Sequence, residues 1–374
     1  PEAVRIGVLQ SKPERAEELK TGGVSIAVLG VSWDRFEPAA DKPDAAYLEQ
    51  LRAELAEYKK AGLEVVLDLG IQYPPAWLFD IPDSRYQNQY GTAFVDRRPG
   101  MNVANSVFNA AVRDRQAAYM ASLFRELGTT WYAVRLGGGW YSELNYPPAS
   151  FQDNTNCYWG FDPLAQGARP DRPAGVTACP VPGWKPGTAS EDNASARRFA
   201  QWYMDSLKNY HDWQITTARS HYAGPLMMLY PSWGIRPGQL DAAIAGDLAG
   251  LTSPEKNGEI QRGFDFTRFI AGIRDSKVWI HCTWLDSNPE WSDDTGSDEA
   301  RWSPARFLSS LARKQKPALT VSAENTGGGG LAALELCARR IRELNIKTFL
   351  WAFGPDLFDN QPPELSDLSP ALAR

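Results

Sequence analysis

Eight short apolar segments recur along the chain, and stretches with apolar residues at helical spacing separate them. The apolar segments predict strands at residues 4–9, 25–33, 64–70, 131–136, 225–230, 277–284, 318–325 and 347–353. Helices are predicted at residues 43–62, 105–127, 194–217 and 300–314, in a segment ending at 344, and between 239 and 273. Strands that alternate with helices form parallel sheets, so eight of them in one chain predict a closed (β/α)8 barrel.

One domain over residues 1–374 fits this pattern, because α/β barrels of the TIM type reach this length when they carry insertions. An open, doubly wound sheet is the alternative fold. No nucleotide-binding fingerprint follows a strand, and the run Gly327 to Gly330 lacks the lysine and the spacing of a phosphate loop. Residues 144–190 are predicted to form a long loop insertion at the face that carries the chemistry.

The charge and composition exclude several classes of partner. With a net charge of −6, the chain lacks the basic excess that nucleic-acid binding needs. No apolar run reaches the length of a membrane span. The three histidines have no metal-ligand spacing, so we expect no metal and no other cofactor. Nothing in the sequence indicates an oligomeric state.

Two of the four cysteines, Cys157 and Cys179, lie in one segment rich in Pro, Gly and Asp without a helical pattern. A disulfide between them is predicted to staple the long loop, which implies an oxidising compartment and a secreted or periplasmic protein. The chain starts at Pro1 without a leader, which suggests a processed or trimmed start. Cys282 and Cys337 are expected to be buried free thiols.

The fourth predicted strand runs into a loop that presents Glu143. Gly137 to Gly139 remove side chains there, and Trp140, Tyr141 and Tyr146 surround the glutamate in the sequence. A carboxyl group among aromatic rings is poorly solvated and keeps its proton to higher pH, which suits a general acid. The alternative is an ordinary loop glutamate that faces water.

A second glutamate, Glu324, ends the seventh predicted strand. In a barrel of this type the chemistry sits at the carboxyl ends of the strands, so Glu143 and Glu324 are expected to face one mouth. Glycoside cleavage needs such a pair: one acid to protonate the leaving oxygen and one carboxylate to attack or to activate water. We predict a retaining glycosidase in which Glu324 attacks and Glu143 acts as acid and then as base.

The remaining candidates for binding the sugar lie near strand ends. They are Trp33, Arg135, Trp140, Ser142, Asn145, Tyr230, His281, Trp284, Asn325 and Trp351. Trp284 and Trp351 are expected to stack under the sugar. Arg135 has an alternative role as an ion-pair partner inside the barrel, for instance of Asp68, and His281 as a hydrogen-bonded core histidine.

Two segments resemble a known group of enzymes. The run VSWDRFEP at residues 31–38 and the run GLEVVLDLGIQYPPAWL at residues 62–78 are similar to the second and third βα units of clan A glycoside hydrolases, particularly the family 42 β-galactosidases. The resemblance implies an exo-acting β-glycosidase with Glu143 as acid/base and Glu324 as nucleophile. Ser142 departs from the pattern, because clan A members usually carry an asparagine there that holds the sugar 2-hydroxyl.

A second resemblance supports a different mechanism. The run ELNYP from Glu143 is similar to the ELRYP of family 14 β-amylases, and AEN at residues 323–325 is similar to their GEN. This implies an inverting enzyme with Glu143 as acid and a base after the sixth strand, for which Asp286 and Glu290 are candidates. The substrate in either case is a glycoside, an oligosaccharide or a polysaccharide. A transglycosylase and a barrel that binds carbohydrate without catalysis remain as further alternatives.

Overall fold

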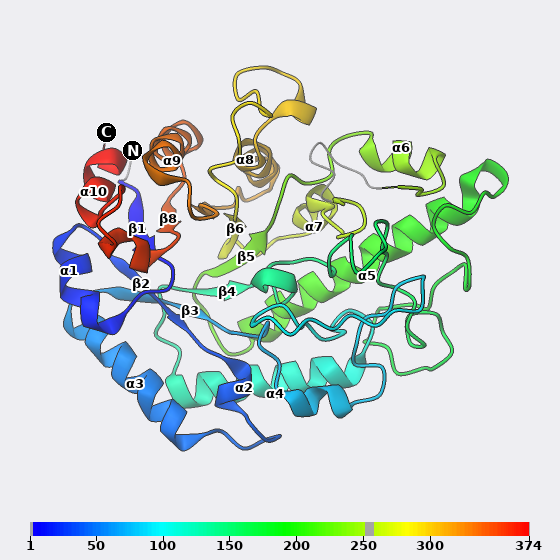
Figure 1. Cartoon of the computed structure of the whole chain (residues 1–374), viewed down its shortest axis with the longest axis horizontal. Helices are drawn as coiled ribbons and strands as arrows, with labels where there is room; N and C mark the ends of the chain where they lie inside the picture. Colours follow the sequence, from blue (N-terminus) through cyan, green and yellow to red (C-terminus); the bar gives the residue numbers. More distant parts are fainter. Residues whose placement is uncertain (1–2, 251–257, 374) are drawn as a thin grey trace.

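The strands form one closed parallel barrel, in which sequence neighbours pair and β1 closes against β8 (Figure 1). This computed structural model describes residues 3–250 and 258–373. The strands are β1 (Arg5–Val8), β2 (Ile26–Gly30), β3 (Glu64–Asp68), β4 (Ala133–Leu136), β5 (Leu226–Tyr230), β6 (Val278–Cys282), β7 (Val321–Glu324) and β8 (Thr348–Trp351). The predicted (β/α)8 TIM barrel is confirmed.

Helices surround the barrel and connect its strands (Figure 1). They are α1 (Ala16–Thr21), α2 (Trp33–Phe36), α3 (Ala45–Lys60), α4 (Ala110–Leu127), α5 (Ala194–Arg219), α6 (Gln239–Ala245), α7 (Phe266–Ala271), α8 (Pro304–Lys314), α9 (Gly330–Leu344) and α10 (Leu365–Ala373). Between α6 and α7, residues 251–257 of the expected helical segment lie outside the described part of the chain. No helix within the described residues has the length and apolar character needed to cross a membrane.

Side-chain caps fix where the longer helices begin. Asp44 accepts a hydrogen bond from the Tyr47 amide at 2.7 Å, and Asn109 accepts one from the Val112 amide at 3.2 Å. Ser303 caps α8 in the same way and is followed by a proline at the first helical position. Each cap satisfies an amide that has no partner within its helix, which contributes about 1 kcal/mol.

The strands read as continuous apolar runs because both of their faces are buried. In β3, Val66 points into the barrel core, whereas Val65 and Leu67 pack against the surrounding helices. In β2, Val28 points into the barrel core in the same way, and Leu29 packs against the surrounding helices. Alternating side chains of a parallel barrel strand therefore meet two apolar environments.

The strand register brings polar residues of different strands together. Asp68 at the end of β3 is the register partner of Arg135 in β4. His281 in β6 is the register partner of Ser322 in β7. Because partners on adjacent parallel strands project to the same side, each pair is placed for a side-chain contact.

The long loop at residues 144–190 is not held by the predicted disulfide, so that prediction is wrong. Cys157 and Cys179 are both buried free thiols in different surroundings: the first contacts the Asn88 amide at 3.5 Å, and the second hydrogen-bonds Gln166. The predicted oxidising compartment therefore loses its basis.

Aromatic packing orders this loop instead. Tyr146 stacks on Tyr203 of α5 with ring centroids 3.9 Å apart. Trp159 is fully buried, and its indole N–H donates to the Pro148 carbonyl at 2.9 Å. Large buried rings of this kind stabilise a loop through the apolar area that they remove from water.

Candidate active site

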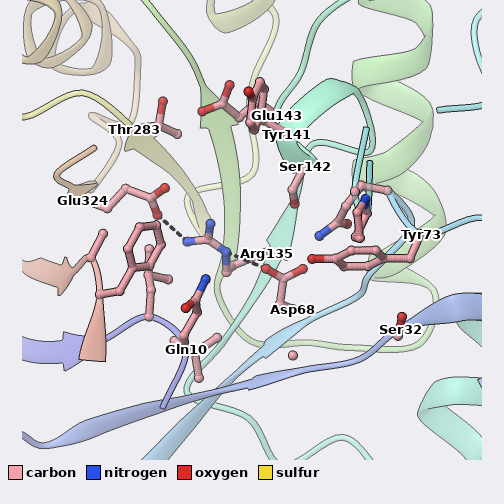
Figure 2. A pocket seen from close by; sticks show the side chains of 18 of the residues that line it. Gln10, Ser32, Asp68, Tyr73, Arg135, Tyr141, Ser142, Glu143, Thr283 and Glu324 are labelled. Atoms are coloured by element: carbon pink, nitrogen blue, oxygen red, sulfur yellow. Dashed lines mark hydrogen bonds and ion pairs between the residues drawn. The ribbon is translucent and has the colours of Figure 1, made fainter. Parts of the chain in front are cut away.

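A cavity of about 1170 Å³ opens at the carboxyl ends of the strands, and both predicted catalytic glutamates line it. Figure 2 shows Glu143 and Glu324 in this cavity with Arg135 and Asp68. A volume of this size lies above the usual range for small-molecule sites and has room for more than one sugar ring.

Glu324 ends β7 and is held as a carboxylate by two side chains. Arg135 Nη1 donates to Glu324 Oε2 at 2.6 Å, and His281 Nε2 lies 2.8 Å from the same oxygen. Only 8% of the Glu324 residue is exposed. Burial acts to raise the pKa of Glu324, but Arg135 and His281 outweigh it and lower the pKa to about 2. The group is therefore ionised at any physiological pH.

The partners of His281 determine its tautomer. Because the Glu324 carboxylate only accepts hydrogen bonds, Nε2 of His281 carries the hydrogen. Burial lowers the pKa of His281, so the ring is neutral and Nδ1 accepts from the Ser322 hydroxyl at 2.8 Å. His281 thus positions Glu324 without adding a charge.

Arg135 also meets Asp68, with Nε and Oδ2 3.2 Å apart. Burial acts to lower the pKa of Arg135, but the two carboxylates raise it overall. The guanidinium therefore stays charged and links β3, β4 and β7. The alternative role expected for Arg135, an ion pair with Asp68 inside the barrel, occurs, and the same guanidinium also contacts Glu324.

The loop after β4 folds back on itself and presents Glu143. A Cβ atom on Gly137 would lie 2.0 Å from the Ser142 carbonyl oxygen, and one on Gly139 would lie 2.4 Å from the Glu143 carbonyl oxygen. Only glycine permits these backbone contacts. Tyr141 and Ser142 both adopt positive φ, of 60° and 69°, which is a strained conformation for residues with side chains.

Two backbone hydrogen bonds fix the other side of this loop. The Leu144 amide donates to the Leu229 carbonyl of β5 at 3.1 Å, and the Tyr146 amide donates to the Arg262 carbonyl at 3.0 Å. Glu143 itself is half-buried and lines the cavity, which differs from the water-facing loop glutamate of its alternative interpretation.

Burial raises the pKa of Glu143 to about 7. The nearby charge of Arg262 and a hydrogen bond with Thr283 act in the opposite direction, and Glu324 adds to the rise. Desolvation is the largest effect because the neutral carboxyl group is favoured where water is scarce. Glu143 is consequently protonated over a large part of the pH range in which Glu324 is ionised.

Several of the predicted binding residues line the cavity. These are Arg135, Trp140, Ser142, Trp284 and Asn325. The Asn325 amide is, however, committed to the backbone of Ala352, since its Nδ2 donates to the carbonyl at 2.9 Å and its Oδ1 accepts from the amide at 2.7 Å. Asn325 therefore shapes the cavity by holding the chain after β8.

The other predicted binding residues are buried outside the cavity lining. Trp33 is fully buried and donates to Glu37 at 2.8 Å, and Trp351 is a core residue at 2% exposure. Tyr230 is fully buried, with its hydroxyl 2.7 Å from His211 Nε2. Asn145 donates to the Trp140 carbonyl at 3.1 Å and so braces the loop before Glu143. His281 acts through Glu324, as described above.

The two candidates for a base after the sixth strand lie outside the cavity lining. Asp286 accepts hydrogen bonds from the Thr326 amide at 2.9 Å and from the Thr326 hydroxyl at 3.0 Å. Glu290 is exposed. Asp286 is thus hydrogen-bonded to a residue, Thr326, that lines the cavity.

Sequence reasoning missed two residues around Glu143, Thr283 and Arg262, and it named Tyr141 only as a neighbouring ring. Thr283 follows β6, Tyr141 is 49% exposed at the cavity, and Arg262 comes from the connection between α6 and α7. The sequence could have indicated Thr283, because this residue directly follows a strand and strand ends face the cavity. Arg262 carried no such signal, because it lies in a segment whose only visible pattern was helical. Within the described residues, no cluster of His, Cys, Asp and Glu has the geometry of a metal site.

The fold matches that of carbohydrate-active enzymes. The catalytic domain of a β-amylase from Paenibacillus polymyxa superposes with a TM-score of 0.70 and 16% identity, over 99% of both chains. A β-galactosidase from the psychrophilic Marinomonas ef1 matches with a TM-score of 0.60 and 13% identity, and one from Bacillus circulans sp. alkalophilus with 0.58 and 12%.

The matches differ in how much of each relative they include. The chain covers 54% and 50% of the two β-galactosidases, so it spans about half of their length, against 99% of the β-amylase domain. No protein family matches the sequence, and no curated protein is significantly similar to it. At these identities the similarity establishes the fold of the barrel.

Proposed function

We propose that this protein cleaves glycosidic bonds, with Glu143 as the general acid and Glu324 as the carboxylate partner. One observation carries the proposal. Two carboxyl groups line the same cavity, and their pKa values are shifted in opposite directions from that of an ordinary glutamate, up to about 7 for Glu143 and down to about 2 for Glu324. Environments that separate the pKa values of two acids in this way mark an acid and its ionised partner. The substrate class is a glycoside, an oligosaccharide or a polysaccharide.

Each group has a defined part in bond cleavage. Glu143 donates its proton to the glycosidic oxygen as the bond to the anomeric carbon breaks, and the leaving sugar departs as an alcohol. The Glu143 carboxylate that remains is stabilised by the charge of Arg262 and by Thr283. Positive charge develops on the sugar ring in the transition state, and the Glu324 carboxylate stabilises it.

Inversion is the stereochemical course that we propose first. It is supported by the full-length match with a β-amylase domain and by the position of Glu324, since Asp286 and Glu290 lie outside the cavity lining. Glu324 then takes a proton from a water molecule that attacks the anomeric carbon. This course requires roughly 6.5 to 9.5 Å between the Glu143 and Glu324 carboxyl groups.

Retention, which the sequence favoured, is the second candidate. The low pKa of Glu324, about 2, supports it, because so weak a base accepts a proton from water poorly but remains an ionised nucleophile. Glu324 would then form a covalent glycosyl intermediate, and Glu143 would deprotonate the water that resolves it. The carboxyl groups would lie about 5 to 5.5 Å apart.

Product stereochemistry tests the proposal directly. Proton NMR of the first-formed anomer, with a panel of aryl glycosides and soluble polysaccharides, distinguishes inversion from retention. Adding an alcohol acceptor detects transglycosylation as a glycosylated alcohol. If no member of a broad panel is cleaved while sugars still bind, the protein is a carbohydrate-binding barrel and the proposed catalysis is wrong.

A further inference from the structure

Arg262 is a buried cation at the cavity, and Glu143 and Glu259 act on its charge although no described residue forms an ion pair with it. Only 6% of the residue is exposed, and it lines the cavity on the side of Glu143. Its Nε is buried without a hydrogen-bond partner. Within residues 3–250 and 258–373, the guanidinium makes no ion pair and no side-chain hydrogen bond.

Two other buried arginines, Arg135 and Arg340, bind carboxylates, whereas Arg172 and Arg219 each also have one buried N–H without a partner. Arg135 binds two carboxylates. Arg340 binds Asp294, the hydroxyls of Ser287 and Ser292, and two carbonyl groups. Leaving a buried charge unpaired costs several kcal/mol, and natural cores avoid it. Arg262 differs from Arg135 and Arg340 because no described side chain accepts a hydrogen bond from its guanidinium.

The aromatic rings around Arg262 cover the faces of its guanidinium, so the N–H groups at the edge can still bind a ligand. The guanidinium carbon lies 5.0 Å from the ring centroid of Trp140 and 4.7 Å from that of Phe264. Aromatic rings over a guanidinium hold its plane and use no N–H group. The N–H donors at the edge form a planar fork, which matches a carboxylate or a sulfate with two parallel hydrogen bonds.

We propose that Arg262 anchors an anionic substituent, a carboxylate or a sulfate ester, on the sugar that occupies the Glu143 side of the cavity. The preferred substrates would then be acidic glycosides, either uronides or sulfated sugars. The inference rests on the proposed function for the reaction, but binding of the acidic sugar itself does not require turnover.

The charged groups around Arg262 make this binding dependent on pH. Glu143 and Tyr141 face it from the loop after β4, and Glu259 acts on it from its own loop. Glu259 accepts from the Ser232 hydroxyl at 2.6 Å and from the Gly234 amide at 2.7 Å. Farther into the cavity, Glu324 and Arg135 act on Glu143.

Glu143 is the group in this set that titrates near neutral pH, at about 7. When it ionises, it competes with the ligand for Arg262. An anionic sugar should therefore bind more weakly as the pH rises from 6 to 8, and a bound anion should in turn help Glu143 to keep its proton.

Calorimetric titration with matched sugars tests the inference. Glucuronate and glucose 6-sulfate are compared with glucose, and galacturonate with galactose, at pH 6 and pH 8. We expect at least about tenfold tighter binding of an acidic sugar than of its neutral counterpart at pH 6, the size of one charge-assisted hydrogen bond. Comparing the uronate with the sulfate identifies the substituent.

Variants separate this role from others. Arg262→Gln should abolish the preference, and Arg262→Lys should keep part of it because the charge remains. Arg306→Gln is the matched control, since Arg306 also lies over an indole, 4.2 Å from the Trp302 ring centroid, but outside the cavity lining. Glu143→Gln should remove the loss of affinity between pH 6 and pH 8.

Equal affinities for acidic and neutral sugars in the parent protein would overturn the inference, and so would an unchanged preference in a folded Arg262→Gln variant. If Arg262 serves Glu143 alone, Arg262→Gln will shift the pH profile equally for every substrate, without any preference for anions. If acidic sugars bind through Arg262 but no glycoside is cleaved, the anion site stands and the proposed hydrolysis fails.

Discussion

Glu143 and Glu324 are the same amino acid in one cavity, and only their surroundings make one an acid and the other a carboxylate. Glu324 receives hydrogen bonds from Arg135 and His281, which favour its charged form. For Glu143, burial outweighs the charge of Arg262 and favours the neutral form. The division of labour between the two glutamates therefore depends on neighbours that are distant in the sequence.

Removing either carboxyl group should abolish most turnover, because Glu143→Gln removes the proton donor and Glu324→Gln removes the negative charge. We expect Glu143→Gln and Glu324→Gln each to lower kcat/KM by about 10²- to 10⁴-fold on glycosides with poor leaving groups. Aryl glycosides with activated leaving groups need no proton, so they should recover activity with Glu143→Gln and not with Glu324→Gln. Thermal unfolding of both variants controls for folding, and equal loss on activated and unactivated substrates would contradict the role of Glu143.

The activity should depend on pH through the proton on Glu143. Because the acid must be protonated and its pKa is raised to about 7, kcat/KM should fall as the pH rises through about 7. Thr283 lowers this pKa, so Thr283→Val should move the descending limb of the profile to higher pH. The exposed Thr177→Val is the control, and a limb that stays in place in Thr283→Val would exclude Thr283 as the hydrogen-bond partner.

At the scale of elements, the loop after β4 supplies Glu143, the proposed acid, and strand β7 supplies the Glu324 carboxylate. Glu324 lies within β7 and has the rigidity of the barrel, whereas Glu143 depends on close backbone contacts at Gly137 and Gly139. The long loop that follows is ordered by stacked rings such as Tyr146 and by buried Trp159. A cross-link is not needed to hold it.

Intact-mass analysis tests how this loop is held. All four cysteines are buried free thiols, so alkylation of the unreduced protein should be slow in the native state and should reach four sites after unfolding. The same protein treated first with a reductant is the control and should give the same count. Two fewer labelled sites in the unreduced sample would restore the disulfide between Cys157 and Cys179.

At the scale of the whole molecule, barrel closure joins residues from four strands into one polar chain. It runs from Asp68 in β3 through Arg135 in β4 and Glu324 in β7 to His281 in β6, and it ends at Ser322. The closed sheet brings strands that are far apart in sequence together around one carboxylate.

Removing one member of this series of polar contacts should change the pKa of Glu324, which lies at its centre. Arg135→Gln removes the cation that most lowers the pKa of Glu324, so the acidic limb of kcat/KM should move to higher pH and kcat should fall by about 10²-fold or more. Arg5→Gln is the control, because Arg5 pairs with the exposed Glu64 at the opposite end of the barrel. An unmoved acidic limb in Arg135→Gln would show that His281 alone sets the pKa of Glu324.

The sequence was sufficient for the barrel and for the positions of Glu143 and Glu324, because apolar runs locate strands and strand ends locate the mouth. It misplaced Trp33, Tyr230 and Trp351, since a large ring near a strand end can point into the core as readily as into the cavity. Whether a ring is buried depends on packing between segments that are distant in the chain. Long-range packing also decides whether two cysteines pair. It likewise places Arg262 beside Glu143, although the connection that carries Arg262 has no recognisable motif.

Arg135 and His281 both bind the same oxygen of Glu324, and this makes the two oxygens unequal. Oε2 is engaged twice, so its bond to carbon has more single-bond character, whereas no described residue donates a hydrogen bond to Oε1. Infrared spectra of isotopically labelled protein should show this as a wide separation of the symmetric and antisymmetric carboxylate stretches. The Glu324 carboxylate is therefore a directional group, and in the proposed reaction the oxygen that it offers to a substrate is chosen before the substrate arrives.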